Sequence, residues 1–369
     1  RIQMAISKKN IYFYIYIFLI NLSLICCIIE IPLQPIKVKG ILKYKNLTYI
    51  EPVSPLIEKN GTFYYQEGNA QINSEHLFFA SIKIGSNSQP FNLILDTGSS
   101  VLWVAKEGVQ GSNRITRFYS PSSSSQATGQ YYQIKYGSGY CNGYYYIDDA
   151  IYILPTRKFN IQFGVASHAD YDMINSDGIV GLAKTYDNEK LSFIHMLRAY
   201  GITDSILFSI KFECESLHDG IRGNLYIGEH DDFRSNQAVV IPLQFYHRNT
   251  FWASTLNSFA LNNGNYEARS NYPTQVMFDT GCNTILLPMR YLIDIQGELK
   301  NFGCFMAQHG SNYQIACQAN GNAPDLKFNF NGNILVMPKR YAYYYGPAHN
   351  YIYSTTIFTG SNKYVIGSP

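Results

Sequence analysis

Charge is scarce in this chain. Asp, Glu, Lys and Arg make up only 15% of the 369 residues, the formal net charge is +3, and no run of Lys or Arg exceeds two residues. So small and dispersed a charge excludes the basic surface that binds nucleic acid. The eight His are scattered and the seven Cys show no zinc-site spacing, so we expect neither a metal nor another cofactor.

Aromatic residues, in contrast, are abundant. They form 15% of the chain, with 32 Tyr and 22 Phe, beside 28 Gly and 14 Pro. Aromatic side chains favour strands, and Gly and Pro favour turns. A chain of this length has room for two lobes that each bury a core. The composition therefore predicts an all-β protein with two lobes.

The tripeptide Asp-Thr-Gly occurs twice, at Asp96–Gly98 and at Asp279–Gly281, 183 residues apart and each time after an apolar run. A given tripeptide arises by chance at roughly one position in several thousand, so the pair is informative. Two carboxyl groups held close together cannot both ionise cheaply, and one stays protonated while the other acts as a base. The repeat predicts such a carboxylate pair.

A second element repeats at nearly the same offset. Ile179–Gly181 begins 83 residues after Asp96, and Val365–Gly367 begins 86 residues after Asp279. Two unrelated buried strands ending in glycine would explain each copy alone. The matched offsets instead indicate one structural unit used twice, with a glycine where one backbone passes close to another.

Residues 1–30 have the pattern of a targeting segment. Lys8 and Lys9 precede the uncharged stretch Ile11–Ile29, which suits a secretory signal. Its 19 residues are also just long enough for a retained membrane anchor, and both interpretations stay open.

The next segment, 31–74, interleaves Lys with apolar residues. It is either a solvated linker or a stretch that covers an acidic site and neutralises it.

The cysteines and the predicted hairpin complete the pattern. Cys304 and Cys317 enclose 12 residues, and we predict a disulfide there, worth about 3 kcal/mol in the loop-entropy model. Cys26 and Cys27 belong to the signal, and Cys141, Cys214 and Cys282 receive no predicted partner.

Strands are predicted at 77–84 and 91–95, a hairpin at 131–153 and a helix at 191–199. Glycines at the turn 136–139 suit a mobile cover over a cleft.

These motifs resemble the pepsin-like (family A1) aspartic endopeptidases, from about Ile31 to the last residue. The matching stretches are DTGSSVLWV at 96–104, YGSG at 136–139, DGIVGLA at 177–183, MFDTG at 277–281, the Cys304–Cys317 pair and YVIG at 364–367. The resemblance implies a bilobal acid-protease fold with an interlobe cleft. It divides the chain into a signal peptide or anchor (1–30), an inhibitory propeptide (31–74), an N-terminal lobe (75–240) and a C-terminal lobe (241–369).

The resemblance also implies roles for individual residues. Asp96 and Asp279 would be the catalytic pair. Supporting residues would be Thr97, Gly98, Ser99, Thr280, Gly281 and Cys282. The flap over the substrate would include Tyr136, Gly137 and Ser138, and the indole of Trp103 would steady the Tyr136 hydroxyl.

Two departures from the family pattern stand out. Cys282 occupies a position where the family has Ser or Thr, and a thiol is a much weaker hydrogen-bond donor than a hydroxyl. The family also continues beyond the position of Gly367, so we expect the final strands of the C-terminal lobe to be missing. These departures motivate an alternative function, a catalytically silent protein that binds peptides.

The expected function is therefore an acid endopeptidase that cleaves proteins and peptides with an activated water molecule. It would be a monomer inhibited by its own propeptide. It would act in the secretory pathway, in a lysosome or vacuole or outside the cell, with a membrane-anchored form as a further option. A β-rich surface adhesin would explain the tyrosines but not the paired Asp-Thr-Gly.

Overall fold

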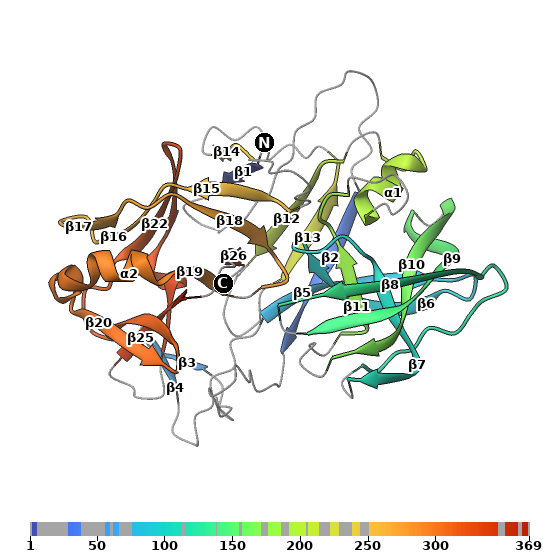
Figure 1. The fold of residues 1–369 in the computed structure, drawn as a ribbon, viewed down its shortest axis with the longest axis horizontal. Helices are drawn as coiled ribbons and strands as arrows, with labels where there is room; N and C mark the ends of the chain where they lie inside the picture. The colour runs from blue at the N-terminus through green and yellow to red at the C-terminus, as the bar shows by residue number, and fades with distance from the viewer. Residues whose placement is uncertain are drawn as a thin grey trace. The chain divides into compact units, whose positions relative to one another are not determined.

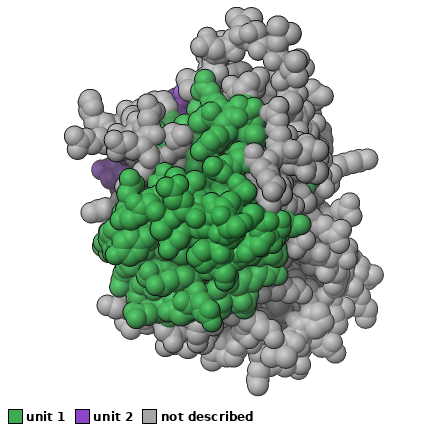
Figure 2. Space-filling view, turned by 90° about the vertical axis from the view of Figure 1, so that its right-hand side faces the viewer, with its two compact units in different colours: residues 1–38, 77–238, 247–251 green, residues 39–76, 239–246, 252–369 purple. Residues whose placement is uncertain are grey.

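The computed structural model describes residues 2–5, 29–37, 56–59, 62–65, 76–112, 115–137, 139–154, 157–170, 176–185, 192–203, 206–213, 222–228, 238–243, 251–282, 284–345, 351–360 and 364–367. The chain divides into two compact units (Figure 1). Unit 1 comprises residues 1–38, 77–238 and 247–251, and unit 2 comprises 39–76, 239–246 and 252–369. Figure 2 shows unit 1 in green. Both units consist mainly of β-strands, as the composition predicts.

Unit 1 is built on one ten-stranded sheet with the order β12-β13-β2-β5-β6-β11-β7-β10-β9-β8. Its strands are β2 (Ile29–Lys37), β5 (His76–Ile84), β6 (Gln89–Asp96), β7 (Trp103–Gly111), β8 (Gln126–Lys135), β9 (Tyr140–Leu154), β10 (Arg157–Ala169), β11 (Gly178–Gly181), β12 (Phe208–Glu213) and β13 (Arg222–Ile227). The strands and the hairpin predicted from the sequence are confirmed. The predicted helix is α1 (Phe193–Ala199), which buries Phe193, Ile194 and Leu197.

Unit 2 contains an eight-stranded and a four-stranded sheet, with β24 paired to β25 in the first. The first is formed by β15 (Ala253–Leu256), β18 (Thr274–Asp279), β26 (Val365–Gly367), β19 (Ile285–Pro288), β25 (Tyr351–Thr359), β21 (Asn312–Gln318), β20 (Cys304–His309) and β24 (Tyr343–Tyr345). The second is formed by β17 (Glu267–Ser270), β16 (Ser258–Asn262), β22 (Asp325–Phe330) and β23 (Asn333–Met337). The helices are α2 (Met289–Ile295), the 3₁₀ helix η2 (Gln296–Phe302) and α3 (Lys339–Ala342).

Four short strands complete the described elements. They are β1 (Ile2–Ala5), the hairpin β3 (Leu56–Lys59) and β4 (Thr62–Tyr65), and β14 (Ala238–Ile241). Among the described residues, no helix combines the length and the hydropathy that a membrane span needs. Of the apolar stretch predicted at Ile11–Ile29, residues 11–28 lie outside the described residues, and Ile29 is the first residue of β2.

The two units repeat one arrangement of strands. The order β6-β11-β7-β10-β9-β8 in unit 1 corresponds to β18-β26-β19-β25-β21-β20 in unit 2. In both, the short central strand runs parallel to the strand that carries Asp-Thr-Gly and antiparallel to the strand that follows it. The next neighbours, β7 with β10 and β19 with β25, are again parallel. The internal repeat predicted from the matched offsets is confirmed.

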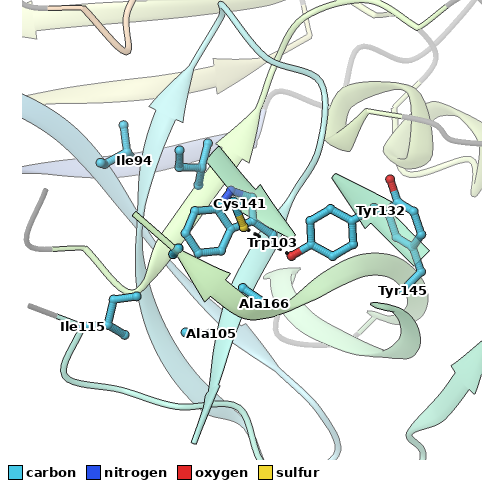
Figure 3. Packing of buried hydrophobic residues seen from close by; sticks show 10 residues of the cluster. Ile94, Trp103, Ala105, Ile115, Tyr132, Cys141, Tyr145 and Ala166 are labelled. Carbon is cyan, nitrogen blue, oxygen red and sulfur yellow. Dashed lines mark hydrogen bonds between the residues drawn. The ribbon is translucent and has the colours of Figure 1, made fainter. Parts of the chain in front are cut away.

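The cysteines have different roles in the two units. In unit 2 the predicted disulfide is present, because Cys304 and Cys317 are directly paired across β20 and β21 and their sulfur atoms are bonded. In unit 1 Cys141 is fully buried in a core cluster with Trp103 and Tyr132 (Figure 3). Its sulfur lies 3.5 Å from the Tyr132 hydroxyl, and burial raises the pKa of this thiol to about 12. Cys141 is therefore a packing residue.

A buried carboxylate fixes the Ser-rich segment that follows β7. Asp148 on β9 is fully buried and accepts hydrogen bonds from Tyr119 (2.6 Å), Ser122 (2.8 Å) and Ser124 (2.6 Å). The backbone N–H of Asp149 donates to it as well, at 2.8 Å. Burial alone would raise the pKa of Asp148, but these donors outweigh it and the pKa lies below its ordinary value. The ionised form is thus the one that the fold stabilises.

Replacing Asp148 with Asn is expected to lower the free energy of unfolding by about 1.5–3 kcal/mol, the range for hydrogen bonds to a charged group. Because the folded pKa lies below the unfolded value of about 3.9, the contribution is present above that pH and is lost as the pH falls through the folded value. Denaturant unfolding at pH 6 and at pH 2.5 would measure this. The deficit should shrink at the lower pH, whereas the neighbouring Asp149→Asn should change little at either. An equal deficit at both pH values would contradict the charge-based account.

Candidate active site

Asp96 is the last residue of β6 and is held there by the strand beside it. Gly181 of β11 lies opposite Asp96 in the parallel pairing, and the Leu182 N–H donates to the Asp96 carbonyl at 2.8 Å. The Ala183 N–H donates to the Ser99 carbonyl, also at 2.8 Å. Only 5% of Asp96 is exposed. The Asp-Thr-Gly turn is therefore anchored at both of its ends by the residues that follow the apolar-apolar-Gly element.

The two carboxylate oxygens of Asp96 have separate donors. The Gly98 N–H donates to Oδ1 at 2.8 Å, and the Ser99 hydroxyl donates to Oδ2 at 2.5 Å. Thr97, the residue between Asp96 and Gly98, is fully buried.

The Ser99 hydroxyl also connects Asp96 to the β8–β9 hairpin. The indole N–H of Trp103 donates to the Tyr136 hydroxyl at 2.8 Å, and that hydroxyl is hydrogen-bonded in turn to Ser99. Burial, together with the nearby charge of Asp96, raises the pKa of Tyr136 well above its ordinary value. Tyr136 therefore keeps its hydroxyl proton.

Tyr136 stands at the end of β8, where the hairpin turns. Its N–H donates to the Gly139 carbonyl at 2.7 Å and closes the turn. Gly137 at the tip has open space around it. Ser138, the remaining predicted flap residue, lies outside the described residues.

The second Asp-Thr-Gly has the same backbone geometry in unit 2. Asp279 ends β18, Gly367 lies opposite it, and the Gly281 N–H donates to Asp279 Oδ1 at 2.9 Å. Thr280 is buried, with 5% exposed. The side chain three residues on differs, because the Cys282 thiol donates to the Thr284 carbonyl at 3.2 Å.

The sequence patterns did not identify Asp177 as a residue that supports β6, the strand that ends at Asp96. Asp177, 3% exposed, accepts from the N–H of Asn92 at 2.8 Å and from Arg117 through its backbone N–H (3.2 Å) and its guanidinium (3.3 Å). It ties the segment before β11 to β6 and to the segment after β7. The position of Asp177 directly before the strand Gly178–Gly181 is the feature of the sequence that could have indicated this role.

Comparison with known proteins identifies the family. Residues 77–368 match the family model described as eukaryotic aspartyl protease, and the chain belongs to this family. The crystal structure of an aspartic proteinase from Irpex lacteus has the same fold, with a TM-score of 0.62 at 18% identity over 79% of this chain and 88% of that one.

The similar curated proteins carry related names. Gastricsin from Mus musculus is 26% identical over 270 residues, which cover 69% of this chain and 65% of gastricsin. Pepsin B from Canis lupus familiaris is 27% identical over 320 residues (83% and 78%), and vacuolar protease A from Aspergillus fumigatus is 28% identical over 284 residues (72% and 66%). The chain thus matches just under two thirds of the length of gastricsin.

Proposed function

We propose that this protein is an aspartic endopeptidase that hydrolyses peptide bonds at acidic pH, with Asp96 and Asp279 as its catalytic pair. The observation that carries the proposal is the repeated loop geometry. Each Asp ends a strand, lies opposite a glycine of a parallel neighbour, and receives the N–H of the glycine two residues on. Two equivalent carboxyl groups supported in this way suit a pair that shares one proton.

In this mechanism the pair activates a water molecule. The ionised carboxylate takes a proton from the water as its oxygen attacks the peptide carbonyl carbon. The protonated partner donates to the carbonyl oxygen. As the C–N bond of the tetrahedral intermediate breaks, the first carboxyl group passes the proton taken from water to the leaving nitrogen, and the partner takes back a proton from the hydroxyl, which releases amine and acid. The β8–β9 hairpin acts as the flap that covers the extended substrate.

The test is digestion of a denatured protein by the activated full-length chain between pH 2.5 and 7.5, with the cleavage sites mapped by mass spectrometry. Internal cleavage should be strongest at acidic pH and unaffected by a metal chelator. Peptide binding without cleavage at any pH would instead support the catalytically silent alternative.

Cys282 offers a specific prediction about the pH dependence. Replacing Cys282 with Thr restores a hydroxyl three residues after Asp279, where Ser99 supports Asp96. A hydroxyl that stabilises the ionised pair should extend the acidic limb of the kcat/KM profile to lower pH. Cys282→Ala, which adds no donor, is the matched control. If Cys282→Thr changes the rate by one factor at every pH, the thiol only fills space.

The segment 31–74 is proposed to be an inhibitory propeptide. Its first part forms β2, which lies between β13 and β5 within the sheet of unit 1. Residues 38–55 lie outside the described residues. At neutral pH the lysines of the segment can pair with ionised carboxylates of the cleft, and this attraction fades as the carboxylates take up protons.

Incubation of the precursor at acidic pH is therefore expected to release a chain that starts near Glu75. Amino-terminal sequencing over time would detect it, with Asp96→Asn showing whether the protein cleaves itself. Full activity of the uncleaved chain at neutral pH would contradict the proposal.

We further propose that the mature enzyme is a monomer of an acidic compartment of the secretory pathway. The relative named vacuolar protease A is consistent with such a compartment.

A further inference from the structure

We propose that Asp170 and His168, at the end of β10, are positioning residues that hold the tip of the β8–β9 hairpin and thereby place Tyr136. The inference rests on the proposed function, in which this hairpin is the flap. Within the family match, these two residues belong to neither Asp-Thr-Gly loop and to no motif that pointed to the active site.

The contacts form a clasp around one residue of the hairpin, Tyr140. The N–H of Tyr140 donates to Asp170 Oδ2 at 2.6 Å, and the Asp170 N–H donates back to the Tyr140 carbonyl at 3.1 Å. The other carboxylate oxygen, Oδ1, lies 3.0 Å from His168 Nε2. The His168 ring stacks on the Tyr140 ring, with 4.6 Å between centroids and 13° between planes. Backbone, carboxylate and ring contacts thus converge on Tyr140.

An irregularity in β10 turns the two side chains toward the hairpin. The register against β9 shifts between Ala166 and His168. Because of this shift Ala166 and Ala169 both lie in the buried core cluster, although they are three residues apart. His168 and Asp170 then share the opposite face, where they meet Tyr140. Bulges that re-aim side chains in this way are common beside active sites.

Gly139 connects the clasp to Tyr136. A Cβ atom on Gly139 would lie 2.5 Å from the Asp170 Cβ atom and 2.5 Å from its carboxylate oxygen, so a side chain there would displace Asp170. The carbonyl of Gly139 accepts the N–H of Tyr136. Tyr136 in turn is bonded to Trp103 and Ser99. A continuous path therefore leads from Asp170 to Tyr136. It runs through the hydrogen bonds of Asp170 to Tyr140, the peptide bond between Tyr140 and Gly139, and the hydrogen bond between Gly139 and Tyr136.

Trp103 provides a direct reporter of hairpin position. The chain has two tryptophans, so Trp252→Phe leaves Trp103 as the only indole. In this background Asp170→Ala should free the hairpin and give water access to the Trp103 N–H. We expect a red-shifted emission, faster quenching by acrylamide, and kcat/KM for a peptide substrate lowered by about tenfold, the factor for roughly 1.4 kcal/mol.

Two further variants separate positioning from stability. Asp170→Asn keeps an acceptor oxygen for the Tyr140 N–H and should recover most of the emission and of kcat/KM. Asp294→Ala is the matched control, since it removes a carboxylate that accepts one hydrogen bond, from Ser270 at 2.6 Å, in unit 2. It should leave the Trp103 emission unchanged.

Emission and quenching that match the parent in a folded Asp170→Ala protein would overturn the inference. If Asp170→Ala does not fold, His168→Ala decides by the same criteria, because it removes both the stacked ring and the partner of Oδ1. The fluorescence readout needs no catalysis. An inactive parent protein would therefore defeat the proposed function while the clasp could still be confirmed or rejected.

Discussion

Replacing Asp96 with Asn is expected to lower kcat/KM for protein cleavage at acidic pH by about a thousandfold or more, close to the contribution of general acid–base catalysis. The amide keeps the shape of the carboxylate and still offers an oxygen to Gly98 or Ser99. It cannot take a proton from water. Kinetic measurement with a peptide substrate, alongside thermal unfolding, separates lost chemistry from lost structure.

The unfolding midpoint of Asp96→Asn should stay near that of the parent. Asp294→Asn, in α2 of unit 2, is the control for any carboxylate loss and should retain activity. Activity of Asp96→Asn within tenfold of the parent would show that Asp96 is not the base.

Replacing Gly181 with Ala is expected to have the largest effect of any substitution outside the catalytic pair, although Gly181 itself does no chemistry. A Cβ atom there would lie 2.3 Å from the Val101 nitrogen and 2.4 Å from the Ser100 carbonyl carbon. These are backbone atoms just after the Asp96 turn, so the turn must move. Misplacing a catalytic group by about 1 Å costs on the order of a hundredfold in rate, and the added strain costs about 1–3 kcal/mol of stability.

Steady-state kinetics and denaturant unfolding of Gly181→Ala would measure both effects. Gly297→Ala is the matched control, because a Cβ atom on Gly297 meets nothing within 4 Å. It should keep full activity and stability. Wild-type kinetics in Gly181→Ala would contradict the claim that close backbone packing fixes the position of Asp96.

The sequence predicted those features that depend on residues near one another in the chain or on a repeated motif. The Asp-Thr-Gly copies and their matched apolar-apolar-Gly elements predicted the repeat. Each copy combines a strand, a turn and a glycine where two backbones approach closely, and these features require the same residue types in both places. The YGSG turn predicted the hairpin, and the spacing of Cys304 and Cys317 predicted their disulfide. In each case a known property of the residues in the pattern explains the structure that they form.

Features that join distant segments could not be predicted. Asp148 has no motif of its own, and its partner Ser122 lies 26 residues away, so only the fold shows the buried carboxylate among hydroxyls. The clasp of Asp170 on Tyr140 spans 30 residues and depends on a register shift in β10 that no residue pattern indicated. The place of β2 between β13 and β5 follows from sheet topology, which alternating apolar residues leave undetermined.

The most direct test of the central claim is to compare Asp96→Asn and Asp279→Asn with the variant that carries both substitutions. Residues that act as one catalytic unit have strongly non-additive effects, so either single substitution should cost nearly as much kcat/KM as the two together. All three proteins should unfold like the parent. If either single variant keeps substantial activity at acidic pH, or if the two losses simply multiply, the two Asp-Thr-Gly repeats do not form one catalytic pair.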